Sequence, residues 1–442
     1  MAFSIPGLLL ACALILQFSS ALPSLPNAFD KRIKASPLAP IPPSKDPFYT
    51  APPNFESVLP GKILRVRVAP GNITSIIANS SAAYNIVYRT TNSRYRPSWA
   101  VTTLFIPIAT TEKLSSESTC VGKALLSYQF PYDTADVDAS PSFDFYTYPQ
   151  GSWIDISTAL GQGWYVSVPD YEGPTVSFTA GVQSGHATPS PVDSVRAVLS
   201  SDFGIGFQAR YALWGYSGGS LASEWAAELQ VHYAPELNFA GAALGGLVPN
   251  VSSVIASVNG NPYAGLIPRS LLGITNQYPE AYKYIVDHLN PSGLYNKSTF
   301  LSSIYLTTPA ADDFFDSQDI WKYFINKTAI LDAPIIQKIY DIEGLMGYHG
   351  VPQMPIFIYK AIGDEVAPIE YADDLVARYC AVGANILYQR NTIGGHLAED
   401  YNGDTRAFAW LSSVFDGTYS TKYPSRVCTI QNVTVGMDTS PI

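Results

Sequence analysis

A serine between glycines is the residue of this chain whose type and spacing most directly indicate covalent chemistry. Residues 215–219 read Gly-Tyr-Ser-Gly-Gly, a G-x-S-x-G match centred on Ser217. A serine hydroxyl attacks a carbonyl carbon only when a positioned base takes its proton, and that base needs a carboxylate to hold its tautomer. The same five residues could instead form a simple glycine turn, so the flanking sequence has to distinguish the two interpretations.

The elements predicted on either side of Ser217 favour the catalytic interpretation. Tyr211–Trp214 is an apolar run short enough for a buried strand, and residues 221–229 repeat apolar side chains at helical spacing. Strand, sharp turn and helix are the context in which G-x-S-x-G forms a nucleophile elbow, with strained backbone at the serine. Ser217 is therefore expected to project from the edge of a sheet.

The partners of Ser217 are expected after it in the chain, first an acid and then a histidine. Asp364 follows the predicted strand Pro355–Ala361, and His396 follows the predicted strand Asn385–Gln389. Both positions place side chains at the sheet edge where the serine would emerge. We therefore predict that His396 is the base and that Asp364 orients it.

Other histidines and acids compete for these roles. The remaining histidines precede the serine, end its helix, or fall in or beside a helical insertion: His186, His232, His288 and His349. Glu365 adjoins Asp364, but its side chain should point away, and Asp373 falls inside the following helix. Asp170 and Glu172 could line a substrate, although we favour a structural role in which they accept backbone N–H groups.

An oxyanion intermediate needs two backbone N–H donors. Gly218, directly after the serine, supplies one of them. The other should come from the loop after the predicted strand 123–128, where Tyr132 and Asp133 stand, although that loop has no His-Gly-Gly-Gly motif.

The order of the predicted elements indicates an α/β fold. Antiparallel strands over residues 61–107 are followed by alternating strands and helices up to residue 247, and the alternation resumes over residues 351–428. Such alternation is typical of a mostly parallel sheet covered by helices on both faces. The segment 248–350 between the two core parts, 61–247 and 351–428, is predicted to form a cap or lid with helical stretches at 268–274, 281–289, 319–324 and 335–342. The final helix of the second core part is expected at 405–414.

The two ends of the chain and the sequons indicate an extracellular protein. Residues 1–21 have an apolar run, Ile5–Phe18, and a small-residue cleavage pattern, as in a signal peptide, and the run is too short to span a bilayer. Residues 22–60 resemble an extended arm, and 429–442 a C-terminal tail. No later stretch is apolar for long enough to form a transmembrane segment. Six sequons are candidate glycosylation sites: Asn72, Asn79, Asn250, Asn296, Asn326 and Asn432.

The cysteines and the net charge limit the partners. Cys12 would leave with the signal peptide, and we predict a disulfide between Cys380 and Cys428 that leaves Cys120 free or buried. No cysteine pair has C-x-x-C spacing or a nearby histidine, so no zinc site is expected. A formal net charge of −10 disfavours binding to nucleic acid or anionic membranes.

With these residues in place, the chain resembles the fungal secretory lipases of the Candida lipase A type, within the α/β-hydrolase superfamily. The resemblance runs from about Pro47 to Cys428 and is far more specific than G-x-S-x-G alone. It is carried by residues 126–129, 164–168, 170–174, 192–197, 213–227 and 242–247.

The resemblance implies an α/β-hydrolase core with a helical cap and lid, and activity on triacylglycerols and simpler acyl esters. It also implies a Ser217–Asp364–His396 triad and an oxyanion hole made by the N–H groups of Asp133 and Gly218. The family usually has two disulfides, and Cys120, which has no evident partner here, departs from that pattern.

We therefore expect a secreted serine carboxylic-ester hydrolase, preferably a triacylglycerol lipase, that works through an acyl-enzyme and needs no cofactor or metal. Its partner would be a lipid or another acyl ester, met at a lipid–water interface if the cap closes in water. A serine peptidase or acyltransferase with the same triad, and a catalytically inactive binding module, are the alternatives. Acyl chain length and oligomeric state are left open.

Overall fold

The computed structural model describes residues 38–109, 123–147, 153–187, 191–201, 203–206, 208–423 and 428–436. The predicted signal peptide, the first part of the predicted arm, Cys120 and the last residues of the predicted tail lie outside these ranges.

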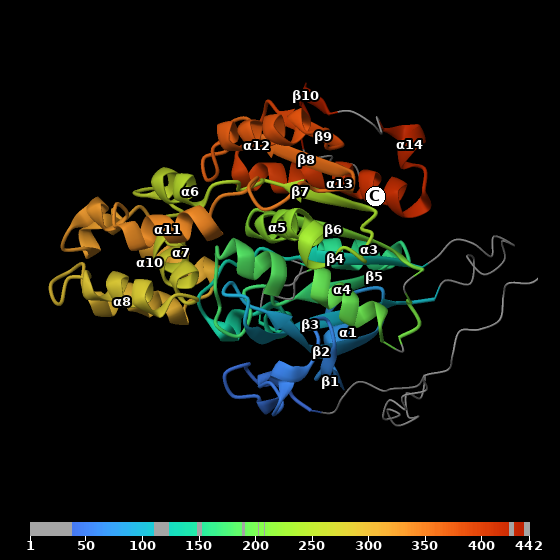
Figure 1. Cartoon of the computed structure of the whole chain (residues 1–442), viewed down its shortest axis with the longest axis horizontal. Helices are drawn as coiled ribbons and strands as arrows, with labels where there is room; N and C mark the ends of the chain where they lie inside the picture. Colours follow the sequence, from blue (N-terminus) through green and yellow to red (C-terminus); the bar gives the residue numbers. More distant parts are fainter. Residues whose placement is uncertain are drawn as a thin grey trace, which may run out of the picture. The chain divides into compact units, whose positions relative to one another are not determined.

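One sheet runs through the described residues, in the strand order β1-β2-β3-β5-β4-β6-β7-β8-β9-β10 (Figure 1). The pairs from β1 to β5 are antiparallel, and all pairs from β5–β4 onward are parallel. The predicted mostly parallel sheet with an antiparallel start is therefore present. The strands are β1 (Ile63–Val68), β2 (Ser80–Thr91), β3 (Pro97–Pro107), β4 (Ala124–Gln129), β5 (Tyr165–Pro169), β6 (Arg210–Tyr216), β7 (Gly241–Gly245), β8 (Ile356–Ala361), β9 (Ile386–Asn391) and β10 (Thr429–Val433).

Helices cover both faces of the sheet, because successive strand side chains point to opposite sides. Leu125 and Leu213 join a core with α4, α5 and α12, whereas their neighbours Leu126 and Ala212 join a core with α3 and α13. The helices outside the insertion are α1 (Ile73–Ile76), α2 (Pro141–Asp144), α3 (Ile154–Gly161), α4 (Pro191–Leu199), α5 (Gly218–Tyr233), α12 (Ile369–Ala381), α13 (His396–Asp416) and α14 (Tyr419–Lys422).

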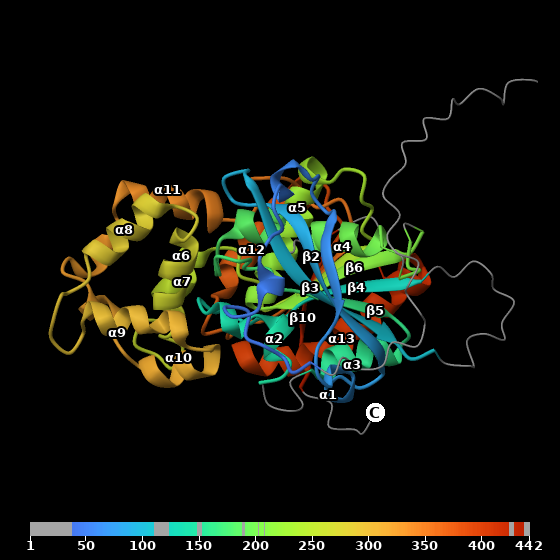
Figure 2. The same cartoon turned by 90° about the horizontal axis from the view of Figure 1, so that it is seen from below.

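Between β7 and β8 the chain forms a group of helices, which lie together in both views and are drawn from yellow-green to orange (Figures 1 and 2). The helices predicted at 268–274 and 335–342 are present, whereas the one predicted at 319–324 is a short 3-10 turn, Ile320–Tyr323. The helices of this segment are α6 (Val251–Val258), α7 (Leu266–Thr275), α8 (Pro279–Asp287), α9 (Lys297–Leu301), α10 (Thr308–Phe315) and α11 (Pro334–Glu343).

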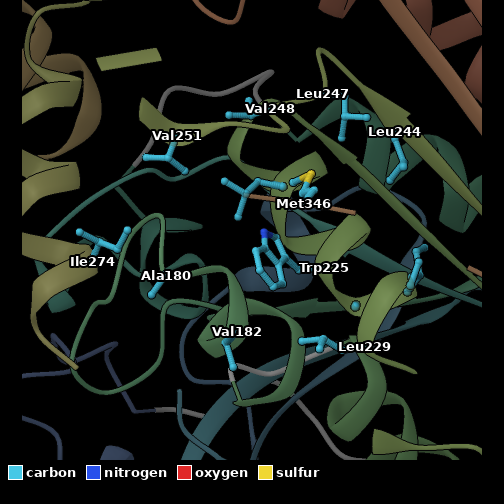
Figure 3. Close-up of a cluster of buried hydrophobic side chains, with 14 of the residues drawn as sticks. Ala180, Val182, Trp225, Leu229, Leu244, Leu247, Val248, Val251, Ile274 and Met346 are labelled. Atoms are coloured by element: carbon cyan, nitrogen blue, oxygen red, sulfur yellow. The ribbon is translucent and has the colours of Figure 1, made fainter. Parts of the chain in front are cut away.

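A buried tryptophan of α5 joins the core to this helical segment. Figure 3 shows Trp225 among apolar side chains that include Val251 of α6, Ile274 of α7 and Met346, and all four belong to one buried cluster. At about 25 cal/mol per Å², burying a large aromatic side chain contributes about 4–6 kcal/mol of hydrophobic free energy. The same helix that starts at the G-x-S-x-G turn thus anchors the insertion.

Two elements near the C-terminus differ from the sequence prediction. Helix α13 begins at His396, whereas we predicted a helix only from residue 405. Gly403 weakens the helical pattern, but the ring of Tyr359 fills the space where its Cβ would lie, so close packing favours glycine there. Residues 429–433, assigned to the tail, form β10 beside β9.

The predicted disulfide is confirmed. Cys380 near the end of α12 is bonded to Cys428, just before β10, with 5.7 Å between their Cα atoms. The bond therefore holds the start of the last strand against the end of α12.

Candidate active site

Ser217 lies in a strained turn between β6 and α5. Its backbone is in the left-handed region, with φ 51°, a conformation that costs on the order of 1–3 kcal/mol for a residue other than glycine. Added Cβ atoms at Gly215 and Gly219 would lie 2.3 Å from the Gly219 carbonyl carbon and 1.8 Å from the carbonyl oxygen of Gln129. The glycines therefore let strand and helix approach closely enough to present the serine at the carboxyl edge of the sheet.

Three predicted side chains meet at this edge. Ser217 Oγ lies 2.8 Å from His396 Nε2, and His396 Nδ1 lies 2.8 Å from Asp364 Oδ2. Asp364 follows β8, and His396 is the first residue of α13, so parallel strands bring both to the edge from which Ser217 projects. In this geometry Nε2 can take the hydroxyl proton while Nδ1–H stays bonded to the carboxylate.

The surroundings of Asp364 keep it ionised. Its Oδ1 accepts the N–H groups of Val366 and Ala367 at 3.0 and 2.8 Å, and its Oδ2 also accepts from Lys360 Nζ at 2.6 Å. Burial alone would raise the pKa of this carboxyl. The hydrogen bond and charge of His396, together with Lys360, outweigh burial and hold the pKa well below its usual range.

The backbone of His396 is fixed from two sides. Its N–H donates to Glu365 Oε2 at 2.9 Å, and its carbonyl accepts from the Tyr216 hydroxyl at 2.5 Å. Glu365 thus binds the first N–H of α13, whereas the ring nitrogens of His396 contact Asp364 and Ser217. No sequence signal indicates this contact, because Glu365 and His396 are 31 residues apart in the chain, although an acidic group at the start of a helix is favourable.

The two predicted oxyanion donors also lie beside the serine. The N–H of Gly218 is in the first turn of α5, where helices leave N–H groups without an intrahelical partner. A Cβ on Gly218 would lie 1.9 Å from Asp133 Oδ1, so the two residues are in close contact. Asp133 has φ 43°, and its carbonyl accepts from Arg269 Nη1 at 2.8 Å. Arg269, on α7, was not identified from the sequence.

The side chain of Asp133 is unusual because it is buried with one unpaired oxygen. Its Oδ1 has no hydrogen-bond partner among the described residues. Burial raises the pKa of this carboxyl to about 7, an effect that Arg269 opposes and Asp312 increases. Asp133 is consequently neutral in mildly acidic solution.

An apolar cavity opens at Ser217. Its empty space, part of which is open to solvent, is about 430 Å³, and Asp133 and Gly218 line it on the core side. Aliphatic side chains of α6 and α7 line the other side: Val251, Val254, Ile255, Val258 and Leu266. A site of this shape can hold an apolar group next to the serine hydroxyl.

The competing residues lie in other parts of the fold. His232 is exposed in the last turn of α5, His288 follows α8 and bonds a backbone carbonyl, and the His349 ring packs on Trp225. The side chain of His186 lies outside the described residues. Asp373 is on α12, as predicted.

The two acids of the loop after β5 have structural contacts, as we favoured. Asp170 accepts the Ser142 N–H at 2.9 Å and the Ser142 hydroxyl at 2.6 Å, and Glu172 accepts the Thr134 N–H at 3.3 Å.

Within the described ranges, no three His, Cys, Asp or Glu side chains come together to hold a metal ion. No helix in the same part of the chain is both long and apolar enough to cross a bilayer.

Comparison with known proteins gives consistent matches over most of the chain. A sequence model of the secretory lipase family matches residues 147–422. Trichothecene C-3 esterase of Fusarium sporotrichioides is 52% identical, covering 89% of this chain and 88% of that protein. A probable trichothecene esterase of Stachybotrys chartarum is 43% identical, covering 91% and 83%. The closed-state structure of Candida antarctica lipase A has a TM-score of 0.79 and 29% identity, covering 90% and 91%.

Proposed function

Since this chain belongs to the secretory lipase family and is a carboxylic ester hydrolase with the α/β-hydrolase fold, we propose that Ser217, His396 and Asp364 form its catalytic triad. The observation that carries the proposal is the continuous chain of hydrogen bonds from Ser217 Oγ through both ring nitrogens of His396 to Asp364 Oδ2.

The reaction follows from the positions of these groups. Ser217 Oγ attacks the ester carbonyl carbon while His396 Nε2 takes its proton, and the N–H groups of Gly218 and Asp133 bind the oxyanion. Nε2 then gives the proton to the leaving alkoxide, which departs as an alcohol and leaves an acyl-enzyme. Water attacks the acyl group with His396 again as base, and the carboxylic acid leaves as Ser217 regains its proton.

The first substrate class that we propose is an acyl ester at carbon 3 of a trichothecene. The two relatives described above, which are 52% and 43% identical to this chain, are both named trichothecene esterases. The similarity extends over most of this chain and most of each relative. The largely aliphatic cavity beside Ser217 supports an apolar substrate, and one extra methylene or ring contact in such a cavity changes binding by only about 1–3 kcal/mol.

Triacylglycerol is the second candidate, because the matching family is named for lipases and one solved structure of similar fold is a lipase. In this case the segment 248–350 would act as a cap whose helices α6 and α7, which line the cavity, open at a lipid–water interface. The rate on an emulsified triacylglycerol would then rise steeply above its solubility limit. Equal rates below and above that limit would contradict the lid.

A fluorophosphonate, which labels activated serines, tests the triad. The wild-type enzyme should take up one label and lose esterase activity, and Ser217→Ala should take up no label and have no esterase activity before or after treatment. Ser413→Ala is the control for a serine outside the proposed site, since Ser413 is buried in α13 and donates to the Trp410 carbonyl at 2.6 Å. Labelling that persists in Ser217→Ala would contradict the proposal.

The substrate classes are distinguished by specificity constants. We expect kcat/KM for a 3-acylated trichothecene to exceed that for a p-nitrophenyl ester with the same acyl group. A value lower than that of the simple ester would remove the trichothecene proposal, and a higher value on emulsified triacylglycerol would favour the lipase. Amide substrates and alcohol acceptors test the peptidase and acyltransferase alternatives in the same series.

We also propose that the protein is secreted after cleavage following Ala21, as the apolar run and the family's name support. N-terminal sequencing of protein from the medium should begin at Leu22. Among the candidate glycosylation sites, Asn72, Asn79 and Asn432 are exposed, whereas the Asn250 and Asn296 side chains cap α6 and α9. Mass spectrometry before and after enzymatic deglycosylation measures which sites are used.

A further inference from the structure

A lysine is completely buried beside the proposed triad. Lys360 lies on β8 with none of its side chain exposed, and its Nζ is 2.6 Å from Asp364 Oδ2. The same oxygen is hydrogen-bonded to Nδ1 of His396 at 2.8 Å. Lysine is almost never fully buried unless it is paired, so a specific reason for this position is required.

Asp364 is the carboxylate that contacts Lys360 directly. Glu370 and Asp373 of α12 act on it only through their charges, and Asp373 is itself paired with Arg390 at 2.9 Å. Arg390 lies opposite Lys360 on β9. Within the described residues, Asp364 is the carboxylate at ion-pair distance from Lys360.

The carboxylates of Glu365 and Glu399, which lie near His396, also have other partners. Glu365 accepts its backbone N–H, and Glu399, one turn along α13, is paired with Arg406 at 2.6 Å. The ring of Tyr216 lies 5.4 Å from the imidazole, centroid to centroid. The carboxylate that the imidazole meets directly is therefore that of Asp364, which it shares with an ammonium group.

Sharing the carboxylate changes the electrostatics of the base. In a triad whose aspartate serves the histidine alone, the carboxylate favours the imidazolium both during the reaction and in the resting enzyme. A second positive charge on the same oxygen disfavours protonation of the ring before the substrate is attacked. Burial lowers the pKa of Lys360, but the charge of Asp364 opposes that effect and supports the ammonium form.

We propose that Lys360 is a positioning residue that holds Asp364 against His396 and, through its charge, keeps His396 available as a base in more acidic solution. The proposal rests on the proposed catalytic triad. It also accounts for a buried charge that the hydrolytic steps themselves do not use.

Three substitutions separate charge from shape: Lys360→Met removes the charge, Lys360→Gln removes it but keeps a donor toward Asp364, and Lys360→Arg keeps it. Lys283→Met is the matched control for net charge, because Lys283 is exposed and its partner, Asp287, is on the same helix. The readouts are the rate of fluorophosphonate labelling and kcat/KM on a soluble ester, between about pH 4 and 6.5. Asp133, with its pKa raised to about 7, stays mostly neutral in this range.

In Lys360→Met and Lys360→Gln, which lack the charge, the pH at which the rate is half its plateau should rise by about one unit. This midpoint should stay at the wild-type value in Lys360→Arg and Lys283→Met. A purely structural lysine would lower the plateau without moving this midpoint. A folded Met or Gln variant with the wild-type midpoint would overturn the proposal, as would an Arg variant that shifts as far as Met.

Removing one partner of a buried pair can prevent folding, so circular dichroism is recorded for each variant, and the Gln variant serves if Met does not fold. Ring-nitrogen NMR observes the protonation of His396 directly, and identical pH profiles in the wild type and the Gln variant would contradict the proposal. A wild-type enzyme that fails to label contradicts the proposed triad instead, whereas normal labelling with unmoved midpoints contradicts only the role of Lys360.

Discussion

Replacing Asp364 with asparagine perturbs four hydrogen bonds at once. Val366 and Ala367 donate backbone N–H groups to Oδ1, and Lys360 and His396 donate to Oδ2. An asparagine side chain has one oxygen and one NH2 group. Its NH2 must therefore face two donors, whichever way the amide is turned.

Both orientations are unfavourable, but they affect different properties. With NH2 toward His396, the amide donates to Nδ1, and the proton then sits on Nε2, which can no longer accept from Ser217. A wrong tautomer of this kind costs about 10⁴ in kcat. With NH2 toward the backbone, two N–H groups lose their acceptor. In either case Lys360 loses its counter-charge, and breaking a buried ion pair costs about 3–5 kcal/mol of stability.

The loss of stability should depend on pH. The pKa of Asp364 in the folded protein lies well below the usual carboxyl value of about 3.9. A lowered pKa stabilises the fold above the unfolded-state pKa, and this contribution is lost as the pH falls through the folded-state pKa. The difference in unfolding free energy between wild type and Asp364→Asn should therefore be largest near neutral pH and shrink below about pH 4.

The assay measures urea unfolding near neutral pH and below about pH 4, together with kcat on a soluble ester. Asp373→Asn is the matched control, since Asp373 is paired with Arg390 but its side chain is 35% exposed. Exposed pairs contribute only about 0–1 kcal/mol. An Asp364→Asn enzyme with wild-type kcat, or a loss of stability no larger than that of the control, would refute the reasoning.

Three further predictions concern neighbouring parts of the fold. With Asp133→Asn, the wild-type fall in kcat/KM as the pH rises through about 7 should disappear, because the buried carboxylate that forms there opposes the oxyanion; a profile identical to wild type would contradict this. Cys380→Ser with Cys428→Ser should lower stability in urea by about 4 kcal/mol and leave kcat unchanged, whereas lost activity would count against it. Gly219→Ala should abolish fluorophosphonate labelling, since its Cβ would meet the Gln129 carbonyl oxygen at 1.8 Å; normal labelling would show that the turn adapts.

Several features of this protein were determined by the sequence alone. The predicted family, the α/β-hydrolase fold, ester hydrolysis and the Cys380–Cys428 disulfide are confirmed. The elbow at Ser217 was predictable because strand, glycine turn and helix are adjacent in the chain, so each residue's neighbours carry the signal. The edge position of Asp364 and His396 followed from the rule that parallel strands end on the same side.

The tertiary structure decided which side chains surround these residues. Lys360 is buried on a strand where a lysine would ordinarily be expected to face water, Arg269 lies in the inserted segment, and the first N–H of α13 donates to Glu365. The contacts of Arg269 with Asp133 and of Glu365 with His396 join residues far apart in the chain, and neither hydrophobic periodicity nor spacing records such a pair. Their energies depend on burial, since a charge costs little in water and needs a partner inside the protein.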